Sequence, residues 1–103
     1  MPTENYTYDE QHFEWDTDKN LSNIRKHGVP FKEAATVFSD YDSKMIEDEE
    51  HSDTEQRFKV IGFSKTARLL TVCHCVRRSE NVTRIISARR ADRTEKDIYG
   101  GAL

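Results

Sequence analysis

The run LLTVCHCV, residues 69–76, constrains the fold more than any other part of the sequence. In an extended chain alternate side chains point to opposite faces, so Leu70, Val72 and His74 share one face of this run. The other face carries a leucine, a threonine and both cysteines of the chain. Because both faces are largely apolar, the run predicts a central strand of a sheet.

Further strand patterns surround this central strand. Residues 56–64 and 82–90 are rich in apolar and β-branched side chains, and short polar loops separate them from the central strand. Residues 44–48 follow the turn-forming sequence SDYDS and predict an edge strand. Residues 12–16 alternate between polar and aromatic side chains and predict one more short strand, whereas residues 49–55 form a charged connector.

Helical patterns occupy the segment between the first strand and the other strands. One helix is predicted over residues 18–27, with Asp16 or Thr17 as its N-cap and Gly28 as the residue that ends it. A second short helix is predicted from residue 30 to residue 38, because apolar side chains recur at helical spacing and a proline stands at its start.

The C-terminal end predicts a third helix, over residues 92–99. Asp92 and Glu95 have the spacing of a capping box. The predicted order is therefore β-α-α-β-β-β-β-α. This order corresponds to an α+β fold with a small, mainly antiparallel sheet, two N-terminal helices and a short C-terminal helix.

The length of 103 residues suits a single domain that spans residues 1–103. Within it we expect residues 12–99 to be folded and residues 1–11 to be a disordered polar leader. No apolar run is long enough to cross a membrane, and the acidic N-terminus lacks the apolar segment of a signal peptide. We therefore expect a cytoplasmic protein that does not contact a membrane.

Cys73 and Cys75 flank His74 in the predicted central strand. Strand alternation places the histidine on the face opposite to the two thiols, so the three side chains do not converge on a metal ion. We interpret both cysteines as buried apolar groups and expect neither a metal site nor a cofactor.

Cationic side chains are concentrated in the C-terminal half. Most of the 16 lysines and arginines lie in residues 56–97, whereas most of the 19 acidic residues lie in residues 1–55. The run RIISARRA, residues 84–91, places three arginines within one predicted strand. A guanidinium on an ordered strand suits a phosphate ligand, so this pattern favours RNA or another polyanion as the ligand.

Four motifs occur in one order along the chain. They are F-x-W-D at residues 13–16, K-H-G-V-x-F-x-E-A at residues 26–34, E-x-R followed by I-G at residues 55–62, and R-I-I-S-A-R-x-A at residues 84–91. Together they resemble the BrnT family of toxins from type II toxin–antitoxin systems. The resemblance covers about residues 13–99 and does not include the acidic leader.

The resemblance implies a RelE-like α+β fold and an endoribonuclease activity that blocks translation. It also implies a cognate BrnA-like antitoxin that neutralises the toxin, typically in a heterotetramer of two toxins and two antitoxins. In such pairs the antitoxin carries the DNA-binding domain, so operator DNA is reached only through the antitoxin.

RNA cleavage without a metal ion uses the 2′-hydroxyl of the substrate as nucleophile. The enzyme must remove its proton, stabilise the charge on phosphorus and protonate the leaving oxygen. The residues that we predict to be catalytic are Lys26, His27, Arg57, Arg77 and Arg89. The residues that we predict to contact RNA are His74, Arg84 and Ser87.

Each of these residues also has a purely structural interpretation. Lys26 and His27 complement the dipole at the end of a helix, and a lone histidine at position 74 suits a hydrogen-bonded core position. In a regular strand Arg84 and Arg89 point to opposite faces, and only a β-bulge would bring them onto one surface. Two alternative functions stay open: a non-catalytic basic binding module, and an inactive toxin remnant that acts as a corepressor with its antitoxin.

Overall fold

The computed structural model describes residues 2–49, 55–77 and 81–101. Its strands are β1 (Thr3–Tyr8), β2 (Gln11–Asp16), β3 (Lys44–Glu47), β4 (Phe58–Phe63), β5 (Leu69–Arg77) and β6 (Val82–Arg90). Its helices are α1 (Thr17–His27), α2 (Phe31–Thr36), the short 3-10 helix η1 (Val37–Ser39) and α3 (Arg93–Tyr99). None of these helices has the length and apolarity that a membrane crossing requires.

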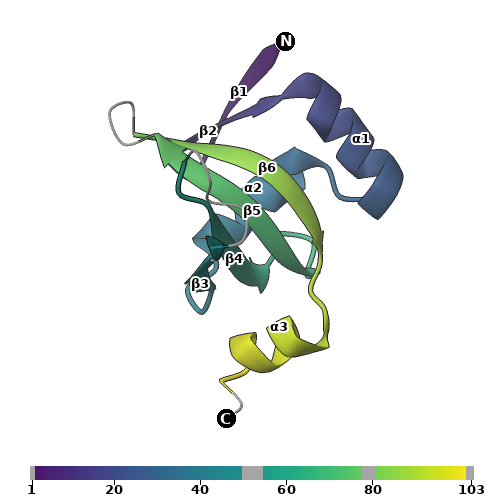
Figure 1. The fold of residues 1–103 in the computed structure, drawn as a ribbon, viewed down its shortest axis with the longest axis vertical. Helices are drawn as coiled ribbons and strands as arrows, with labels where there is room; N and C mark the ends of the chain where they lie inside the picture. The colour runs from purple at the N-terminus through teal and green to yellow at the C-terminus, as the bar shows by residue number, and fades with distance from the viewer. Residues whose placement is uncertain (1, 50–54, 78–80, 102–103) are drawn as a thin grey trace.

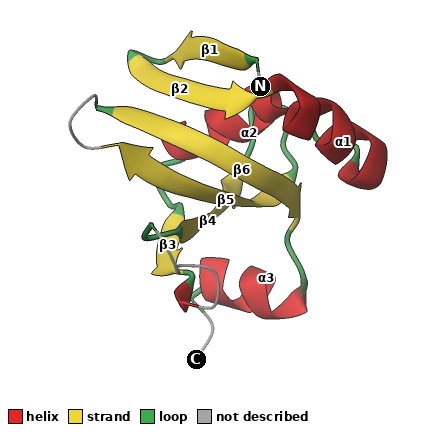
Figure 2. Ribbon diagram, turned by 45° about the horizontal axis from the view of Figure 1, so that its top comes forward, coloured by secondary structure: helices red, strands yellow, loops and turns green. Residues whose placement is uncertain are grey.

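The strands form one six-stranded sheet in the order β1-β2-β6-β5-β4-β3 (Figure 1). Neighbouring strands are antiparallel except for β2 and β6, which are parallel. Helices α1 and α2 pack on one face of the sheet, against β6 (Figure 2). The expected α+β class, the mainly antiparallel sheet and the central position of residues 69–77 are confirmed.

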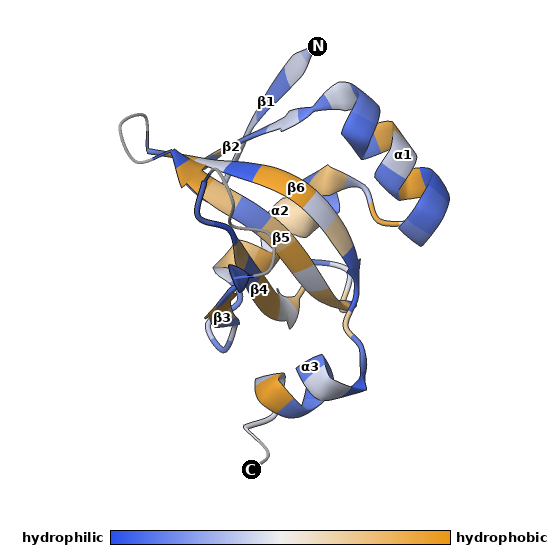
Figure 3. Cartoon of the chain, in the orientation of Figure 1, coloured by the Kyte–Doolittle hydropathy of each residue, from blue (hydrophilic) through white to orange (hydrophobic). Residues whose placement is uncertain are grey.

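The core lies between the sheet and the first two helices. Trp15, Phe31, Leu70 and Val72 have no exposed surface. Hydrophobic residues are frequent along β5 and β6, whereas α1 is mostly hydrophilic with a few hydrophobic residues (Figure 3). This core packs α2 against the central strands of the sheet.

The predicted ends of the first helix are confirmed. The Asp16 carboxylate accepts hydrogen bonds from the backbone N–H groups of Asp18 and Lys19, at 2.8 and 3.2 Å. Gly28 ends α1 in the left-handed conformation, with φ of 69°, and its N–H donates to the carbonyl of Ile24. A glycine adopts this conformation without the steric cost that a Cβ atom imposes.

The second helix is shorter than predicted. α2 ends at Thr36, and Pro30 is its N-cap rather than a member of its first turn. The Thr36 hydroxyl donates to the carbonyl of Glu33 at 2.6 Å, and its oxygen accepts the N–H of Lys65 at 2.8 Å. These bonds fix the end of the α-helix, and the chain continues as the 3-10 helix η1.

The prediction of a disordered leader at residues 1–11 is wrong for the described residues of that segment. β1 pairs with β2 from Thr3 opposite Asp16 to Tyr8 opposite Gln11. The alternate side chains of β1 pack toward the core: Glu4 accepts a hydrogen bond from Trp15 Nε1 at 2.9 Å. Tyr6 lies with its ring centroid 5.7 Å from that of Trp15. The alternation of polar and aromatic side chains in ENYTY is the signal that identifies this strand.

A β-bulge interrupts the pairing of the two central strands. Cys73 lies opposite Ser87, whereas the next residue, His74, lies opposite Ile85. Ile86 is therefore an extra residue on β6. The bulge changes which side chains of β6 share a face, and this determines the composition of the surface described below.

The third helix begins with the predicted capping box. Asp92 Oδ1 accepts the N–H of Glu95, and Glu95 Oε1 accepts the N–H of Asp92, both at 2.9 Å. At the other end of the helix the Tyr99 hydroxyl donates to Asp40 Oδ2 at 2.7 Å. Glu95 also bonds Thr71 on the face of β5 that points away from α1 and α2, so α3 covers part of that face.

The remaining expectations concern connections. β3, at the edge of the sheet, confirms the strand that was predicted over residues 44–48. The charged connector at residues 49–55 and the loop at residues 79–81 lie mostly outside the described residues.

Candidate active site

Two hollows lie side by side on the molecule. The first, which we call the sheet hollow, is on the face of the sheet away from α1 and α2. Its lining residues are Asp48, Arg57, Lys59, Cys73, Ile86, Ser87 and Arg89. The second, which we call the helix hollow, lies between α1 and β6. Its lining residues are Lys19, Ser22, Asn23, Lys26, His27, Ile86 and Ser87.

The residues of the β-bulge join the two hollows. Ile86 and Ser87 line both of them. Ser87 is exposed, and Ile86 is partly exposed although it follows the buried Ile85 in sequence. The bulge therefore presents a polar hydroxyl and an apolar side chain at the boundary between the two hollows.

The sheet hollow brings together three of the predicted site residues, Arg57, Ser87 and Arg89. Strand β6 supplies two of them, whereas Arg57 directly precedes β4. Lys59, which the sequence analysis did not select, adds another cation from β4. Its position two residues after Arg57 places it on the same face of the chain, so the alternation of strand side chains could have identified it.

Arg89 is held by a bidentate ion pair with Glu95. Its Nη1 and Nη2 atoms donate to Glu95 Oε1 and Oε2 at 2.7 and 2.8 Å. The side chain of Arg89 is 36% exposed and that of Glu95 is 7% exposed. Hydrogen bonds from Arg89, the Asp92 backbone and Thr71 outweigh the effect of burial and lower the pKa of Glu95 from 4.5 to about 2. Both side chains are therefore charged at neutral pH.

Acidic and thiol groups also line the sheet hollow. Asp48 is buried, and its Oδ2 atom lies 3.8 Å from the Sγ atom of Cys73. Burial and then the charge of Asp48 raise the pKa of the Cys73 thiol. A thiol of this kind stays protonated at neutral pH and is a poor nucleophile.

The helix hollow contains Lys26 and His27, which lie in the last turn of α1 and are exposed. Their position at the C-terminus of the helix agrees with the favourable interaction of cations with the helix dipole. Because both also line the hollow next to Ser87, the structural and the chemical interpretation of these two residues are compatible.

Arg77 and Arg84 lie outside both hollows. Arg84 Nη1 and Arg77 Nε lie 2.7 and 3.2 Å from the same Glu14 oxygen, Oε2. The carboxylate of Glu14 is almost fully buried, and the two arginines are partly exposed above it. The structure therefore groups Arg77 with Arg84 and not with Arg57 and Arg89.

His74 does not fit the prediction that it contacts RNA. Its side chain is 1% exposed and packs against the rings of Phe38 and Phe58, with centroids 4.8 and 6.0 Å away. Burial lowers the pKa of the imidazole, which is therefore neutral at pH 7. Its Nδ1 atom lies 3.2 Å from the carbonyl of Val72. His74 therefore occupies a core position, which is the structural alternative that the sequence analysis gave for this residue.

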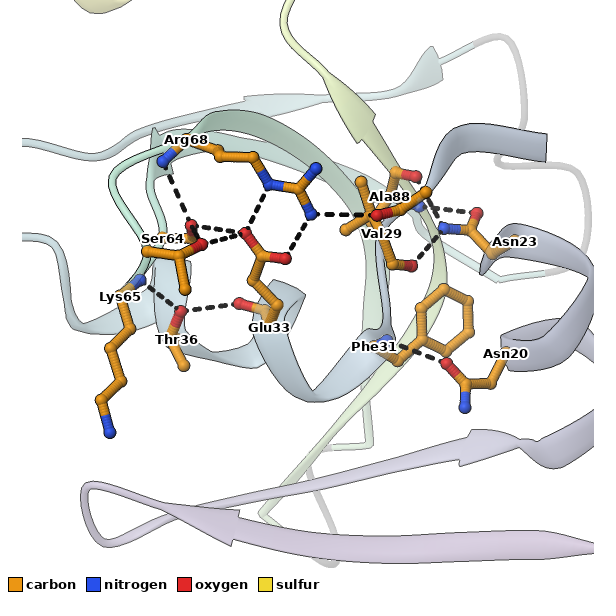
Figure 4. Close-up of polar contacts among 12 residues, drawn as sticks. Asn20, Asn23, Val29, Phe31, Glu33, Thr36, Ser64, Lys65, Arg68 and Ala88 are labelled. Carbon is orange, nitrogen blue, oxygen red and sulfur yellow. Dashed lines mark hydrogen bonds and ion pairs between the residues drawn. The ribbon is translucent and has the colours of Figure 1, made fainter. Parts of the chain in front are cut away.

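Polar side chains connect α1 and α2 to the strands and to the segments beside them (Figure 4). Asn23 Nδ2 donates to the carbonyls of Val29 and Ala88, and its Oδ1 accepts the N–H of Ala88 at 3.1 Å. This buried amide connects α1 to β6 directly beside Ser87. It is a polar residue that the sequence alone does not reveal, because two of its three hydrogen bonds are to the backbone of Ala88, 65 residues away.

A second, partly buried ion pair joins Glu33 of α2 to Arg68, which precedes β5 (Figure 4). Hydrogen bonds from Arg68, Thr66 and Ser64 lower the pKa of Glu33 from 4.5 to about 2 despite its burial. Gly62 also has a structural role, because a Cβ atom at this position would lie 3.0 Å from Val37 Cγ1.

Comparisons with known proteins agree with the sequence motifs. The family model described as "Ribonuclease toxin, BrnT, of type II toxin-antitoxin system" matches residues 15–95. The chain is also similar to the 1.1 Å crystal structure of the Brucella abortus ribonuclease toxin BrnT, with a TM-score of 0.59 and 23% identity. This match covers 77% of the present chain and 94% of that chain, and it shows a shared fold. No curated protein matches the sequence.

The family match spans most of the chain, from Trp15 in β2 to Glu95 in α3. It includes both hollows and excludes β1, which lies before the matched residues. The chain therefore belongs to the BrnT family of ribonuclease toxins from type II toxin–antitoxin systems.

Proposed function

We propose that this toxin is a metal-independent endoribonuclease of RelE-like type that cleaves RNA at the boundary of the two hollows and thereby inhibits translation. One observation carries the proposal. The sheet hollow is lined by three cations, Arg57, Lys59 and Arg89. At Ser87 it meets the helix hollow, which is lined by Lys26 and His27. Cations on both sides of the Ser87 hydroxyl can bind and stabilise the negative charge of a phosphodiester that lies beside this residue.

The proposed reaction is an internal transesterification. The ribose 2′-oxygen loses its proton and forms a bond to phosphorus, while the bond from phosphorus to the 5′-oxygen breaks. The 5′-oxygen then takes up a proton. The products are a 2′,3′-cyclic phosphate and a free 5′-hydroxyl, and no oxidant or reductant is required.

The proposed roles follow from position. Arg57 and Arg89 stabilise the charge that builds up on the phosphate oxygens, because a guanidinium binds such an oxyanion bidentately. Ser87 donates a hydrogen bond to the same phosphate. His27 transfers the protons, since imidazole is the side chain that most often does so, and Lys26 stabilises the charge beside it.

Arg77 and Arg84 are assigned a different role in this proposal. They contact the RNA backbone away from the cleaved bond, because their shared carboxylate keeps them outside the hollows. Contacts of this kind raise affinity without reading the base sequence.

Membership of a type II toxin–antitoxin family implies an antitoxin partner. We propose that this partner is BrnA-like, that it forms a heterotetramer of two toxins and two antitoxins, and that it supplies the contact with operator DNA. RNA as substrate places the active toxin in the cytoplasm.

The decisive experiment compares Arg57→Ala with Arg90→Ala in RNA cleavage by the purified chain, with EDTA present throughout. The two variants lose the same charge, but Arg90 is an exposed residue outside both hollows. The proposal expects about a 10²–10³-fold loss of rate for Arg57→Ala, typical of one oxyanion donor, and little change for Arg90→Ala.

Other outcomes favour the alternatives. Equal rates for the two variants would exclude the sheet hollow as the active site. RNA binding without cleavage by the wild-type chain would instead support a binding module or an inactive remnant that acts as a corepressor.

A further inference from the structure

We propose that Glu95 is a positioning residue for RNA cleavage, which fixes the guanidinium of Arg89 so that one of its edges remains open to the phosphate. This inference rests on the proposed function, because it assumes that Arg89 acts on the phosphate in the sheet hollow. Glu95 itself does not line either hollow, so we assign it no contact with the substrate.

The pairing geometry leaves part of Arg89 open. A guanidinium has five N–H groups, on Nε, Nη1 and Nη2. Glu95 accepts one hydrogen bond from Nη1 and one from Nη2. The carbonyl of Arg90 also accepts a hydrogen bond from Nη1, at 3.3 Å. Within the described part of the chain, neither Nε nor the second Nη2 hydrogen has a hydrogen-bond acceptor. These two groups lie side by side and form a second bidentate edge for a phosphate.

The carboxylate of Glu95 is itself held rigidly. Its Oε1 atom accepts hydrogen bonds from Thr71 Oγ1 at 2.8 Å and from the Asp92 N–H at 2.9 Å, in addition to Arg89. These donors belong to β5, to the N-cap of α3 and to β6. Because three separate elements hold one buried carboxylate, Arg89 does not need to be ordered again when RNA binds.

The partly buried ion pair of Arg68 and Glu33 provides a contrast within the same protein. Arg68 bonds Glu33 through Nε and Nη2, and Nη2 also donates to the carbonyl of Gly28. The edge that stays open in Arg89 is therefore occupied in Arg68, and neither Arg68 nor Glu33 lines either hollow. The side chain of Glu33 is 12% exposed, against 7% for Glu95, and both carboxyl groups have a pKa lowered to about 2, but Glu33 holds an arginine that lies outside the proposed site.

This contrast defines the experiment, which measures RNA cleavage and RNA affinity for Glu95→Gln and Glu33→Gln. Glutamine keeps the shape of the side chain and removes the charge that holds the guanidinium. We expect Glu95→Gln to lower kcat by about 10–100-fold, as the loss of an orienting partner typically does. RNA affinity should change little, because the other cations still contact the backbone. Glu33→Gln should lower the thermal midpoint similarly and leave kcat unchanged.

A double-mutant cycle separates positioning from stability. If Glu95 acts through Arg89, then adding Glu95→Gln to Arg89→Ala should produce no further loss of kcat. A further loss equal to that in the wild-type background would overturn the inference. Equal effects of Glu95→Gln and Glu33→Gln on kcat would overturn it as well, because they would show a general effect of stability.

Two further variants, Thr71→Val and Arg89→Ala, test the inference if Glu95→Gln is unstable or if the role of Arg89 is in question. If Glu95→Gln does not fold, Thr71→Val can replace it, because this change removes only one hydrogen-bond donor to the Glu95 carboxylate. We expect Thr71→Val to lower kcat by a smaller factor. A normal kcat in this variant would overturn the inference. Normal cleavage by Arg89→Ala would refute the proposed role of Arg89 itself. Strong loss in Arg89→Ala with full activity in Glu95→Gln would refute only the role of Glu95.

Discussion

Arg84 and Arg89 lie on the same face of the sheet although five positions separate them on one strand. Arg84 is opposite Cys75 and Arg89 is opposite Thr71, and these two β5 residues share a face. The extra residue Ile86 produces this arrangement. A regular strand would have placed the two guanidinium groups on opposite faces. The bulge therefore extends the cationic surface from the sheet hollow toward Glu14.

The first prediction concerns this extended surface. Arg84→Ala should weaken RNA binding by a similar factor for RNAs of different sequence, and it should reduce the salt dependence of binding by about one counterion. The single-turnover rate at saturating RNA should stay close to wild type. Titrations between about 50 and 200 mM salt measure the slope. A slope that does not change would show that Arg84 does not contact the backbone.

The second prediction concerns stability in acid. The carboxyl groups of Glu33 and Glu95 have pKa values lowered from 4.5 to about 2. Their contribution to the free energy of unfolding is complete above pH 4.5, and it is lost as the pH falls from about 4.5 toward 2. Denaturant unfolding across this range should show a steep loss of stability in the wild type. Glu33→Gln and Glu95→Gln should each flatten that slope, and an unchanged slope in both would contradict the ion-pair description.

The third prediction separates His74 from RNA binding. His74→Phe retains an aromatic ring beside Phe38 and Phe58, so the variant should fold and cleave RNA. The native state excludes the proton that the unfolded chain binds below about pH 6.5, so the wild type loses stability as the pH falls below that value. His74→Phe should remove this dependence. A folded His74→Phe variant that has lost RNA affinity would restore the original prediction of an RNA contact.

The fourth prediction concerns β1, which lies before the residues of the family match. Tyr6 packs on Trp15 and lies 5.7 Å beneath the Nζ atom of Lys32, but it touches neither hollow. Tyr6→Ala should lower the free energy of unfolding by about 1–3 kcal/mol, less than the loss of a fully buried aromatic ring. RNA cleavage measured well below the thermal midpoint should be unchanged, and a large loss of activity in a stable variant would assign β1 a role in the reaction.

Much of the fold could be predicted because its signals are local. The Asp16 cap, the Gly28 terminator and the capping box of Asp92 and Glu95 each depend on residues a few positions apart. The apolar character of both faces of residues 69–76 was enough to place β5 in the centre of the sheet. Strand β1 was not predicted because most of the N-terminal residues are polar, and only two tyrosines carry the alternation that identifies the strand.

The candidate site was less predictable because its arrangement depends on contacts between distant residues. Alternation alone could not show the bulge at Ile86, which requires the pairing of β5 with β6. The partners of Arg77 and Arg84 come from β2, about 70 positions away in the case of Arg84. By contrast, the residues predicted from the motifs include five that line the joined hollows, and their catalytic or RNA-binding roles stay predictions. These five are Lys26, His27, Arg57, Ser87 and Arg89.

The most direct test of the proposed chemistry uses one RNA whose cleavage position has been mapped, and the same RNA with a single 2′-deoxynucleotide at that position. Both are incubated with the wild-type toxin in EDTA. The account predicts cleavage of the first RNA to a 2′,3′-cyclic phosphate and a 5′-hydroxyl, and no cleavage of the second at the mapped bond. Cleavage of the deoxy-substituted bond, or cleavage that stops in EDTA, would contradict metal-independent attack by the 2′-hydroxyl.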